Sequence, residues 1–395
     1  MNKAISPSLP SAEKMLLIKM GAVGDLIMAS ACFEAVRQNF PQARISHLVS
    51  GQLLHTVKEN PNIDQFIAVD TDALYKGGWF SRLREAVRLI FLLRQERFDL
   101  VFVMHWAWQF SLLAFLCGIP VRVGFKRKWG RMFLTHRVRP DESRNNREAY
   151  LDLLRVLRIP DRYQKSYYYL SEQEDRILET FVEEHGVALL EQLIALAPGG
   201  GQNIKQTMLT RLWPVDRYIE LIGNILRSGS FRIVLIAGPD DGPVIELILD
   251  RYPQCIDTRD MSFGEKASIL RRCRLLVGND SAPIHMSTAM NIPTYSLWGP
   301  TNPKRYGHPS PYHIPFFKKI ECSPCYSYGE FPPCDDNQCL QAISVAEVWD
   351  AQQAVLIPKS PKPASIGSSV PEKEFPGETV SSPQVDPDRP SQSIA

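Results

Sequence analysis

The stretch Met15–Asp25 (MLLIKMGAVGD) joins a short apolar run to a glycine-rich turn, and a helical pattern then continues to Asn39. The same order returns at Leu193–Gly201 (LIALAPGGG), where an apolar run again ends in glycines ahead of a helical segment. Short apolar runs of this kind are typical of strands in a parallel sheet, which is buried on both faces. Each stretch therefore predicts the first strand, turn and helix of an α/β unit.

Apolar runs and helical segments alternate on either side of these two stretches. Further strands are expected at Arg44–Ser50, Gln65–Val69 and Phe98–Met104, with a long basic amphipathic helix at Trp79–Arg97. The second unit repeats the pattern, with strands expected at 231–237, 274–277 and 294–298. The alternation predicts an α/β fold of two Rossmann-like domains with parallel sheets, and a ligand site at the carboxyl ends of both sheets.

Four parts of the 395-residue chain follow from this interpretation. We expect a flexible N-terminal tail at 1–13, a first domain at 14–185, a second at 186–357 and a Pro/Ser-rich tail at 358–395. The last part holds eight prolines and eight serines. Such a segment cannot bury enough apolar surface to offset its ordering entropy, so the sequence predicts disorder there.

The bulk composition bounds the class of protein. Hydrophobic residues make up 44% and charged residues 22%, as in an ordinary globular enzyme. A net charge of +2 gives no general attraction to nucleic acid, which is not an expected partner. The first thirteen residues lack the apolar core of a signal peptide, and the most apolar stretch, Phe110–Val123, is shorter than the ~20 residues that span a bilayer. We expect a cytoplasmic protein, at most peripheral on a membrane.

The first motif with chemical content is Gly21–Asp25, between the first strand and its helix. Gly24 lets a ligand approach the backbone, and a helix N-terminus favours negative charge. Asp25 has two interpretations. It is either the N-cap of the helix or a general base, which the positive end of the helix would keep ionised.

The second motif is the loop that contains Gly199 and Gly200, followed by Lys205 and Arg211. Consecutive glycines after a strand form a loop that can wrap an anion, and the two cations can neutralise phosphate charge. The alternative is a flexible surface loop with solvated cations.

The third motif, Asn279–His285 (NDSAPIH), also lies between a strand and a helix. The backbone N–H groups near Ser281 would face a diphosphate, and the Ser281 hydroxyl would add a donor. His285 could donate to a phosphate oxygen or be a satisfied core histidine. Asp280 would repel phosphate, so we expect its partner to be a ribose hydroxyl or a backbone amide.

These motifs, KMGAVGD at 19–25, RLWP at 211–214, NDSAPIH and LWGPTNP at 297–303, together resemble glycosyltransferase family 9, the lipopolysaccharide heptosyltransferases. The resemblance runs from about Met15 to Val355. It implies a GT-B fold, in which two Rossmann-like domains face a central cleft, and an inverting mechanism without a required metal or other cofactor. It also implies ADP-heptose as donor and the inner core of lipopolysaccharide as acceptor.

Position within the motifs implies residue roles as well. Asp25 matches the general base of the family, Arg211 a contact to the diphosphate, and Met261 a residue beside the adenine. The donor-binding block falls on Asp280, Ser281, Ala282 and His285. Arg211 stands where lysine is usual, and Ala282 stands where glycine is common, which places a methyl group near the phosphates.

A basic segment, Arg122–Arg139, contains seven Lys or Arg residues, no acid and three aromatic rings. One interpretation is a solvated loop. The other is a surface for a phosphorylated, lipid-linked saccharide acceptor at an anionic membrane, because basic and aromatic residues favour such interfaces. The acceptor-binding candidates are Lys126, Arg127, Lys128 and Arg131.

Four of the eight cysteines lie close together, at Cys322, Cys325, Cys334 and Cys339. The first pair has the spacing of zinc ligands and the second pair is irregular. Reduced, unligated thiols are the first interpretation, and a structural zinc site is the alternative.

The sequence thus predicts an inverting, metal-independent glycosyltransferase that moves heptose from ADP-heptose to a lipopolysaccharide acceptor. Three alternatives stay open: a GT-B enzyme with another nucleotide sugar or acceptor, a hydrolysing epimerase, and a non-catalytic nucleotide-sugar-binding protein. Asp25 argues against the last, because a binding protein needs no base.

Overall fold

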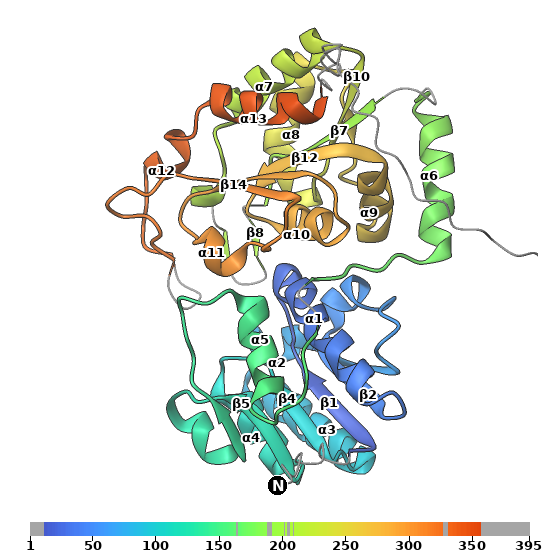
Figure 1. The fold of residues 1–395 in the computed structure, drawn as a ribbon, viewed down its shortest axis with the longest axis vertical. Helices are drawn as coiled ribbons and strands as arrows, with labels where there is room; N and C mark the ends of the chain where they lie inside the picture. Colours follow the sequence, from blue (N-terminus) through green and yellow to red (C-terminus); the bar gives the residue numbers. More distant parts are fainter. Residues whose placement is uncertain are drawn as a thin grey trace, which may run out of the picture. The chain divides into compact units, whose positions relative to one another are not determined.

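The structure is a computed structural model that describes residues 12–162, 165–187, 192–200, 202–203, 206–207, 209–326 and 331–356 (Figure 1). The chain divides into one compact unit, residues 1–357, and a second stretch, residues 358–395. That second stretch, for which we predicted a Pro/Ser-rich tail, lies outside the described residues, as do residues 1–11 of the predicted N-terminal tail.

The first half of the compact unit is built on a six-stranded parallel sheet of order β3-β2-β1-β4-β5-β6. Its elements in chain order are β1 (Lys14–Ile18), α1 (Val23–Asn39), β2 (Arg44–Ser50), the 3-10 helix η1 (Gly51–Thr56), β3 (Gln65–Val69), α2 (Thr71–Tyr75), α3 (Trp79–Glu96), β4 (Leu100–Val103), α4 (Trp108–Leu116), β5 (Val121–Phe125), the 3-10 helix η2 (Lys128–Phe133), β6 (His136–Val138) and α5 (Asn146–Arg155).

The second half repeats this order with β11-β10-β7-β12-β13-β14, again all parallel. Its elements are α6 (Glu172–Glu184), β7 (Gln192–Ala197), the antiparallel pair β8 (Gln202–Asn203) and β9 (Gln206–Thr207), η3 (Leu209–Arg211), α7 (Val215–Ser228), β10 (Phe231–Leu235), η4 (Pro239–Asp241), α8 (Gly242–Arg251), β11 (Ile256–Asp257), α9 (Phe263–Arg272), β12 (Cys273–Asn279), α10 (Ala282–Ala289), β13 (Thr294–Trp298), α11 (Pro303–Tyr306), β14 (His313–Phe317), α12 (Gln338–Gln341) and α13 (Val345–Leu356).

Alternate residues of each strand enter opposite cores, as period-two alternation requires. In the first sheet, Met15 and Leu17 of β1 pack with α1 and α5, whereas Leu16 and Ile18 pack with α3 and α4. In the second sheet, α7, α8 and α13 cover one face, and α6, α9 and α10 cover the other. Both sheets are therefore sandwiched between helices, as the alternation of apolar runs and helical segments predicted.

Helix α1 belongs to both halves. Its cysteine, phenylalanine and alanine side chains join the core of the first sheet, while Ile27 joins a core made by α6, α9 and α10. Eleven of its seventeen residues are buried, so it has no solvent-facing polar side of the usual width. Helix α1 consequently contributes to a core in each half.

The basic segment Arg122–Arg139 differs from the solvated loop that we considered. It contains β5, η2 and β6, so part of it is sheet. Val123 and Phe125 of β5 are buried in the core, and Thr135 receives the N–H of Arg122 at 2.8 Å. The many cations obscured a strand pattern in which only alternate residues are apolar.

Candidate functional site

Both sheets reverse their strand order at one point, between β1 and β4 in the first and between β7 and β12 in the second. In open parallel sheets, ligands bind outside the carboxyl ends of the strands at such a switch point. The three glycine and acidic motifs follow β1, β7 and β12, three of these four strands. The topology thus brings the sequence candidates to the two switch points.

Asp25 lies in the first turn of α1, directly after β1. The Lys19 ammonium donates to Asp25 Oδ2 at 2.9 Å. The other carboxylate oxygen, Asp25 Oδ1, accepts hydrogen bonds from Asn146 Nδ2 at 3.2 Å and from the Tyr150 hydroxyl at 3.1 Å. Lys19 is 2% exposed, whereas the Asp25 side chain is 27% exposed and remains accessible to a ligand.

Asp25 is not the N-cap of α1, so that alternative is wrong. The helix begins at Val23, its N-cap is Ala22, and the cap makes no side-chain hydrogen bond. Burial alone would raise the pKa of Asp25, but the Lys19 charge and three hydrogen bonds outweigh it, and the pKa lies below its usual value. Asp25 is therefore ionised at neutral pH, as a proton acceptor must be.

Helix α5 supplies the two uncharged donors of this site. Asn146 and Tyr150 are four residues apart and so share one helix face. The preceding residue, Asn145, caps the helix by accepting the N–H of Arg147, and its amide also donates to the carbonyls of Lys304 and Gly307 in the second half. We did not identify Asn146 and Tyr150 from the sequence. The available signal was their spacing of four residues, which places both on one face of a helix.

The start of the glycine loop after β7 is held by the side chains of Asn279 and Asp241. The Asn279 amide donates to the carbonyls of Pro198 at 2.7 Å and Gly199 at 3.2 Å. Asp241 accepts the N–H of Gly200 at 3.0 Å. The described start of the loop, residues 198–200, is thus attached to the end of β12 and to Asp241.

Gly200 is required by both conformation and space. Its φ of +101° lies in the region that side chains rarely adopt, and an added Cβ would fall 2.4 Å from the Ser281 Cβ. The other predicted members of the loop, Gly201 and Lys205, lie outside the described residues.

Arg211 and Asp280 form a buried ion pair, with 2.7 Å between the guanidinium and Asp280 Oδ2. Arg211 also donates to the Asp280 backbone carbonyl, and the Thr301 hydroxyl donates to Asp280 Oδ2 at 2.6 Å. Burial opposes ionisation, yet the Arg211 charge and its neighbours lower the pKa of Asp280 to about 2. We expected a ribose hydroxyl or a backbone amide as the partner of Asp280. Its partner is instead the cation that we assigned to the diphosphate.

His285 lies where the two halves touch. Its ring is packed so closely on Gly24 that an added Cβ there would lie 2.5 Å from Nε2, and Asp280 Oδ1 is 3.8 Å from the same nitrogen. Its Nδ1 is 2.9 Å from His308 Nε2, and His308 Nδ1 is 3.1 Å from the Ser166 hydroxyl. Burial keeps the pKa of His308 well below its usual value, so His308 is neutral at pH 7. His285 is therefore buried and hydrogen-bonded, which fits the alternative of a satisfied core histidine, and its contact to a phosphate stays a prediction.

The pKa values of two tyrosines depend on both the Asp25 and the Asp280 carboxylates. Burial raises the pKa of Tyr306, and both carboxylates add to the rise. Burial also raises the pKa of Tyr326, with contributions from the same two carboxylates. The two rings lie 5.6 Å apart in an edge contact. Each ring is thus within electrostatic reach of both carboxylates.

One acceptor candidate, Arg127, lies beside this site. Its guanidinium is 5.1 Å from the Trp106 ring, which stacks on Phe125 and is also approached by Arg305 at 5.7 Å. Trp106 follows β4 at the switch point. Lys126 and Arg131 are exposed, and the Lys128 side chain lies outside the described residues.

The remaining donor candidates lie at or before the starts of two helices, and their contacts to a donor stay predictions. Ser281 is the N-cap of α10, and its hydroxyl donates to the Asn279 carbonyl at 3.1 Å. Ala282 is the first residue of α10. Met261 lies in the turn before α9 and packs partly on the core that contains Ile27.

The four C-terminal cysteines are free thiols. Cys322 and Cys334 are exposed, Cys325 is half-buried and Cys339 is buried. Burial raises the pKa of the Cys325 and Cys339 thiols. Among the described residues no group of three or more His, Cys, Asp or Glu side chains is placed to hold a metal ion, so the zinc alternative has no ligand set there.

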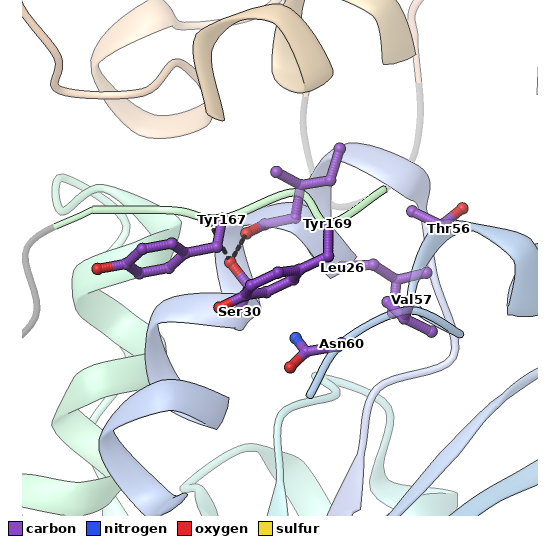
Figure 2. A pocket seen from close by; sticks show the side chains of 8 residues that line it. Leu26, Ser30, Thr56, Val57, Asn60, Tyr167 and Tyr169 are labelled. Carbon is purple, nitrogen blue, oxygen red and sulfur yellow. Dashed lines mark hydrogen bonds between the residues drawn. The ribbon is translucent and has the colours of Figure 1, made fainter. Parts of the chain in front are cut away.

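A small pocket opens beside α1 (Figure 2). Figure 2 shows the Ser30 hydroxyl at its wall, where it receives the N–H of Tyr167 at 2.7 Å. The lining is apolar or neutral: Leu26, Ile27, Ser30, Thr56, Val57, Asn60, Tyr167 and Tyr169. None of the sequence candidates lines this pocket, so it is not the candidate site.

Comparison with known proteins agrees with this architecture. Residues 86–333 match the family model of glycosyltransferase family 9 (heptosyltransferase). Lipopolysaccharide heptosyltransferase 3 of Escherichia coli K12 is 24% identical over 293 residues, which cover 71% of this chain and 80% of that protein. Lipooligosaccharide heptosyltransferase 2 of Haemophilus ducreyi is 24% identical, with 73% and 84% covered.

Solved structures give the same result for the fold. A family 9 glycosyltransferase from Veillonella parvula superposes with a TM-score of 0.73 at 22% identity, covering 87% of this chain and 97% of that one. The E. coli heptosyltransferase WaaC with ADP gives 0.67 at 16% identity, covering 87% and 99%. The fold is thus the GT-B fold of these enzymes, and since the family model spans more than half of the chain, this protein is a glycosyltransferase that belongs to family 9.

Proposed function

We propose that this chain transfers heptose from ADP-heptose to a hydroxyl of a lipopolysaccharide core acceptor, with inversion at the anomeric carbon and with Asp25 as general base. The observation that carries the proposal is the environment of Asp25. Its carboxylate is ionised, partly exposed and fixed by three donors, next to the glycine that contacts His285. A base oriented in this way is what proton removal from an acceptor hydroxyl requires.

The diphosphate of the donor would lie at the start of α10. The first N–H groups of a helix have no partner within the helix, and they point at an anion bound there. Arg211, held in place by Asp280, and His285, held in place by His308, flank this helix start. Lys205, from the glycine loop, is a further candidate. Charge that develops on the leaving diphosphate would be stabilised by these groups without a metal.

The proposed step is a single displacement. The acceptor oxygen forms a bond to the anomeric carbon while the bond from that carbon to the phosphate oxygen breaks and ADP leaves with the electron pair. The acceptor proton passes to Asp25. Attack from the face opposite the leaving group inverts the configuration. Trp106 and Arg127 offer an aromatic and cationic surface for a phosphorylated saccharide acceptor on the first half, on the cytoplasmic side of the membrane.

The first test is Asp25→Asn, which keeps the shape of the side chain and removes its basicity. We expect turnover to fall about 10²–10⁴-fold, the usual contribution of a general base. Transfer is measured with ADP-heptose and a water-soluble, deacylated core acceptor. Asp72→Asn, which changes the exposed Lys76–Asp72 ion pair, is the matched control and should keep full turnover. An Asp25→Asn enzyme with normal turnover would remove Asp25 from this role.

Donor identity is tested separately by thermal shift with ADP, UDP and GDP. A ligand that binds the folded state raises apparent stability by about 2.7 kcal/mol at a hundredfold excess over its Kd. ADP should raise Tm in both the wild type and Asp25→Asn. A selective response to UDP or GDP would exclude ADP-heptose as the donor.

A further inference from the structure

Helix α3 carries a second apolar stripe that faces outward. Phe80, Leu83, Val87 and Phe91 recur at intervals of three or four residues and are all exposed, Phe80 by 72% and Phe91 by 64%. Trp79, at the start of the helix, is exposed as well. Residues at this spacing lie on one side of a helix. We call these five residues the α3 outer stripe.

The outer stripe is not the core-facing side of α3. The helix packs on the first sheet through Leu89 and Leu93, whose side chains are buried. These two residues lie on nearly the opposite side of the helix from Val87 and Phe91 at 100° per residue. The helix therefore has one apolar side for its own core and another with no partner in the described part of the chain.

Exposed apolar side chains are concentrated around this helix. Trp108, Phe115 and Leu116 of α4, with Trp129 and Met132 of η2, are also exposed. Helices α3 and α4 cover the same face of the first sheet, because both enter the core that contains Ile18 and Val103. Element η2 packs on α4, with the Phe133 and Phe115 rings 5.5 Å apart. Scattered exposed apolar residues are normal, but a concentration on one face indicates an interaction site.

Most of the exposed charges on α3 are positive, and its second acid, Glu96, lies near Arg44 at the far end of the helix. Arg82, Arg84 and Arg94 are exposed on α3. The acid in the same helix segment, Glu85, is buried and pairs with Arg88 at 2.6 Å, so it does not offset these cations at the surface. Basic η2 and its neighbours, with Lys126 and Arg131, extend the positive region. Aromatic and aliphatic side chains flanked by arginine are the pattern of helices that lie in the headgroup region of an anionic bilayer.

We propose that the α3 outer stripe docks this protein on the surface of an anionic lipid bilayer, with α3 parallel to the membrane and its arginines on the lipid phosphates. The inference extends the proposed function, because a lipid-anchored acceptor is presented at such a surface. No helix in the described residues is long and apolar enough to cross a membrane, so this contact is peripheral. The first turn of α3 follows β3 and α2, and so lies toward the sheet edge that carries Asp25.

The test is sedimentation with vesicles, in the absence of donor and acceptor. The wild type should bind vesicles of phosphatidylcholine with phosphatidylglycerol, and bind vesicles of phosphatidylcholine alone much more weakly. The double variant Phe80→Gln/Phe91→Gln should lose about tenfold or more in partitioning, because it removes two rings from the buried face. Arg84→Gln/Arg94→Gln should weaken binding to the anionic vesicles about fivefold per arginine at low salt, and by less as salt rises.

Leu247→Gln/Ile314→Gln is the matched control, since it removes two exposed apolar side chains from α8 and β14, far from α3 in the sequence. It should bind vesicles like the wild type. The proposal is overturned if the wild type does not bind anionic vesicles, or if Phe80→Gln/Phe91→Gln binds like the control. It is also overturned if the wild type is a dimer that this variant dissociates, because the stripe would then be an interface between copies.

The result of the vesicle-binding test does not depend on whether the proposed transfer reaction is correct. All three double variants should keep wild-type transfer to the deacylated, water-soluble acceptor, because the stripe is outside the Asp25 site. Loss of vesicle binding with normal transfer supports the membrane contact. An enzyme that binds vesicles but transfers no heptose would overturn the proposed function and leave the docking surface intact.

Discussion

The ionisation of Asp25 depends on one neighbouring side chain. Lys19 is almost fully buried, six residues before Asp25, and its ammonium faces a carboxylate that has lost part of its hydration. Without Lys19, burial would be the dominant influence, and it raises the pKa of a carboxyl group. Lys19 therefore keeps the proposed base unprotonated in weak acid, although it makes no contact with substrate in our proposal.

Lys19→Met should move the acid limb of the kcat/KM profile to higher pH, because the pKa of Asp25 rises once its cation is gone. Linkage gives the effect on stability. A lowered pKa of Asp25 stabilises the folded state at pH values above the usual pKa of Asp, and the variant loses this contribution. We also expect destabilisation of about 3 kcal/mol, since a carboxylate would be left without its buried partner.

The matched control is Lys76→Met, which breaks a Lys–Asp pair of the same 2.9 Å length on the surface. It should change stability by less than about 1 kcal/mol and leave the pH profile unmoved. A Lys19→Met enzyme with an unchanged acid limb would contradict the electrostatic role of Lys19. The profile is measured with the soluble acceptor down to about pH 3.5, below the usual Asp pKa of about 3.9.

Helix α5 shows how one cap can serve both stability and the site. Asn145 accepts an N–H at the start of α5 and reaches two carbonyls around α11 in the other half. The next residue and Tyr150 then point at Asp25. Rotation or fraying of this one helix start would displace two of the three donors to the proposed base.

Asn145→Ala should cost about 1 kcal/mol for the lost cap, and more for the lost contacts to the second half. It should also lower turnover, because the Asn146 and Tyr150 donors shift. Asp70→Ala, which removes only the cap of α2, is the control. It should lower the free energy of unfolding by a similar amount and leave turnover unchanged. Equal turnover in both variants would show that the α5 cap is only structural. Denaturant unfolding and transfer assays give the two readouts.

Local patterns predicted elements well where the chemistry is local. Strands β2, β3 and β13 begin and end where the sequence placed them, because apolar runs mark their limits. Asp25, Arg211, Asp280 and His285 were found through motifs at strand ends. Tyr150 and His308 were not, since their partners lie 125 and 23 residues away and no local pattern encodes such pairs. The Arg211–Asp280 ion pair was missed for the same reason.

One contact between the two halves depends on a missing side chain. Gly24 of α1 has no Cβ, and the His285 ring from the second half occupies the space where one would lie. Asn145 and Ser166 add polar contacts between the halves, to Gly307 and His308. The position of the proposed base relative to the donor site is thus set by a small number of groups.

Gly24→Ala should push His285 away from α1 and reduce both stability and transfer. Overpacking of this kind costs about 1–3 kcal/mol. Gly78→Ala, at the N-cap of α3, is the control, because an added Cβ there meets no atom within 4 Å. Wild-type stability and turnover in Gly24→Ala would contradict the tight contact. Thermal unfolding and the transfer assay measure the two effects.

Helix α1 has a consequence for how this protein can be divided. Because Ile27 is covered by residues from α6, α9 and α10, a fragment that stops in the connection before α6 would be synthesised with an uncovered apolar surface on its first helix. Such a fragment should aggregate and bind hydrophobic dyes, even though its own sheet is complete. Co-expression of both fragments should restore solubility. The two halves would then fold cooperatively and would not be independent domains.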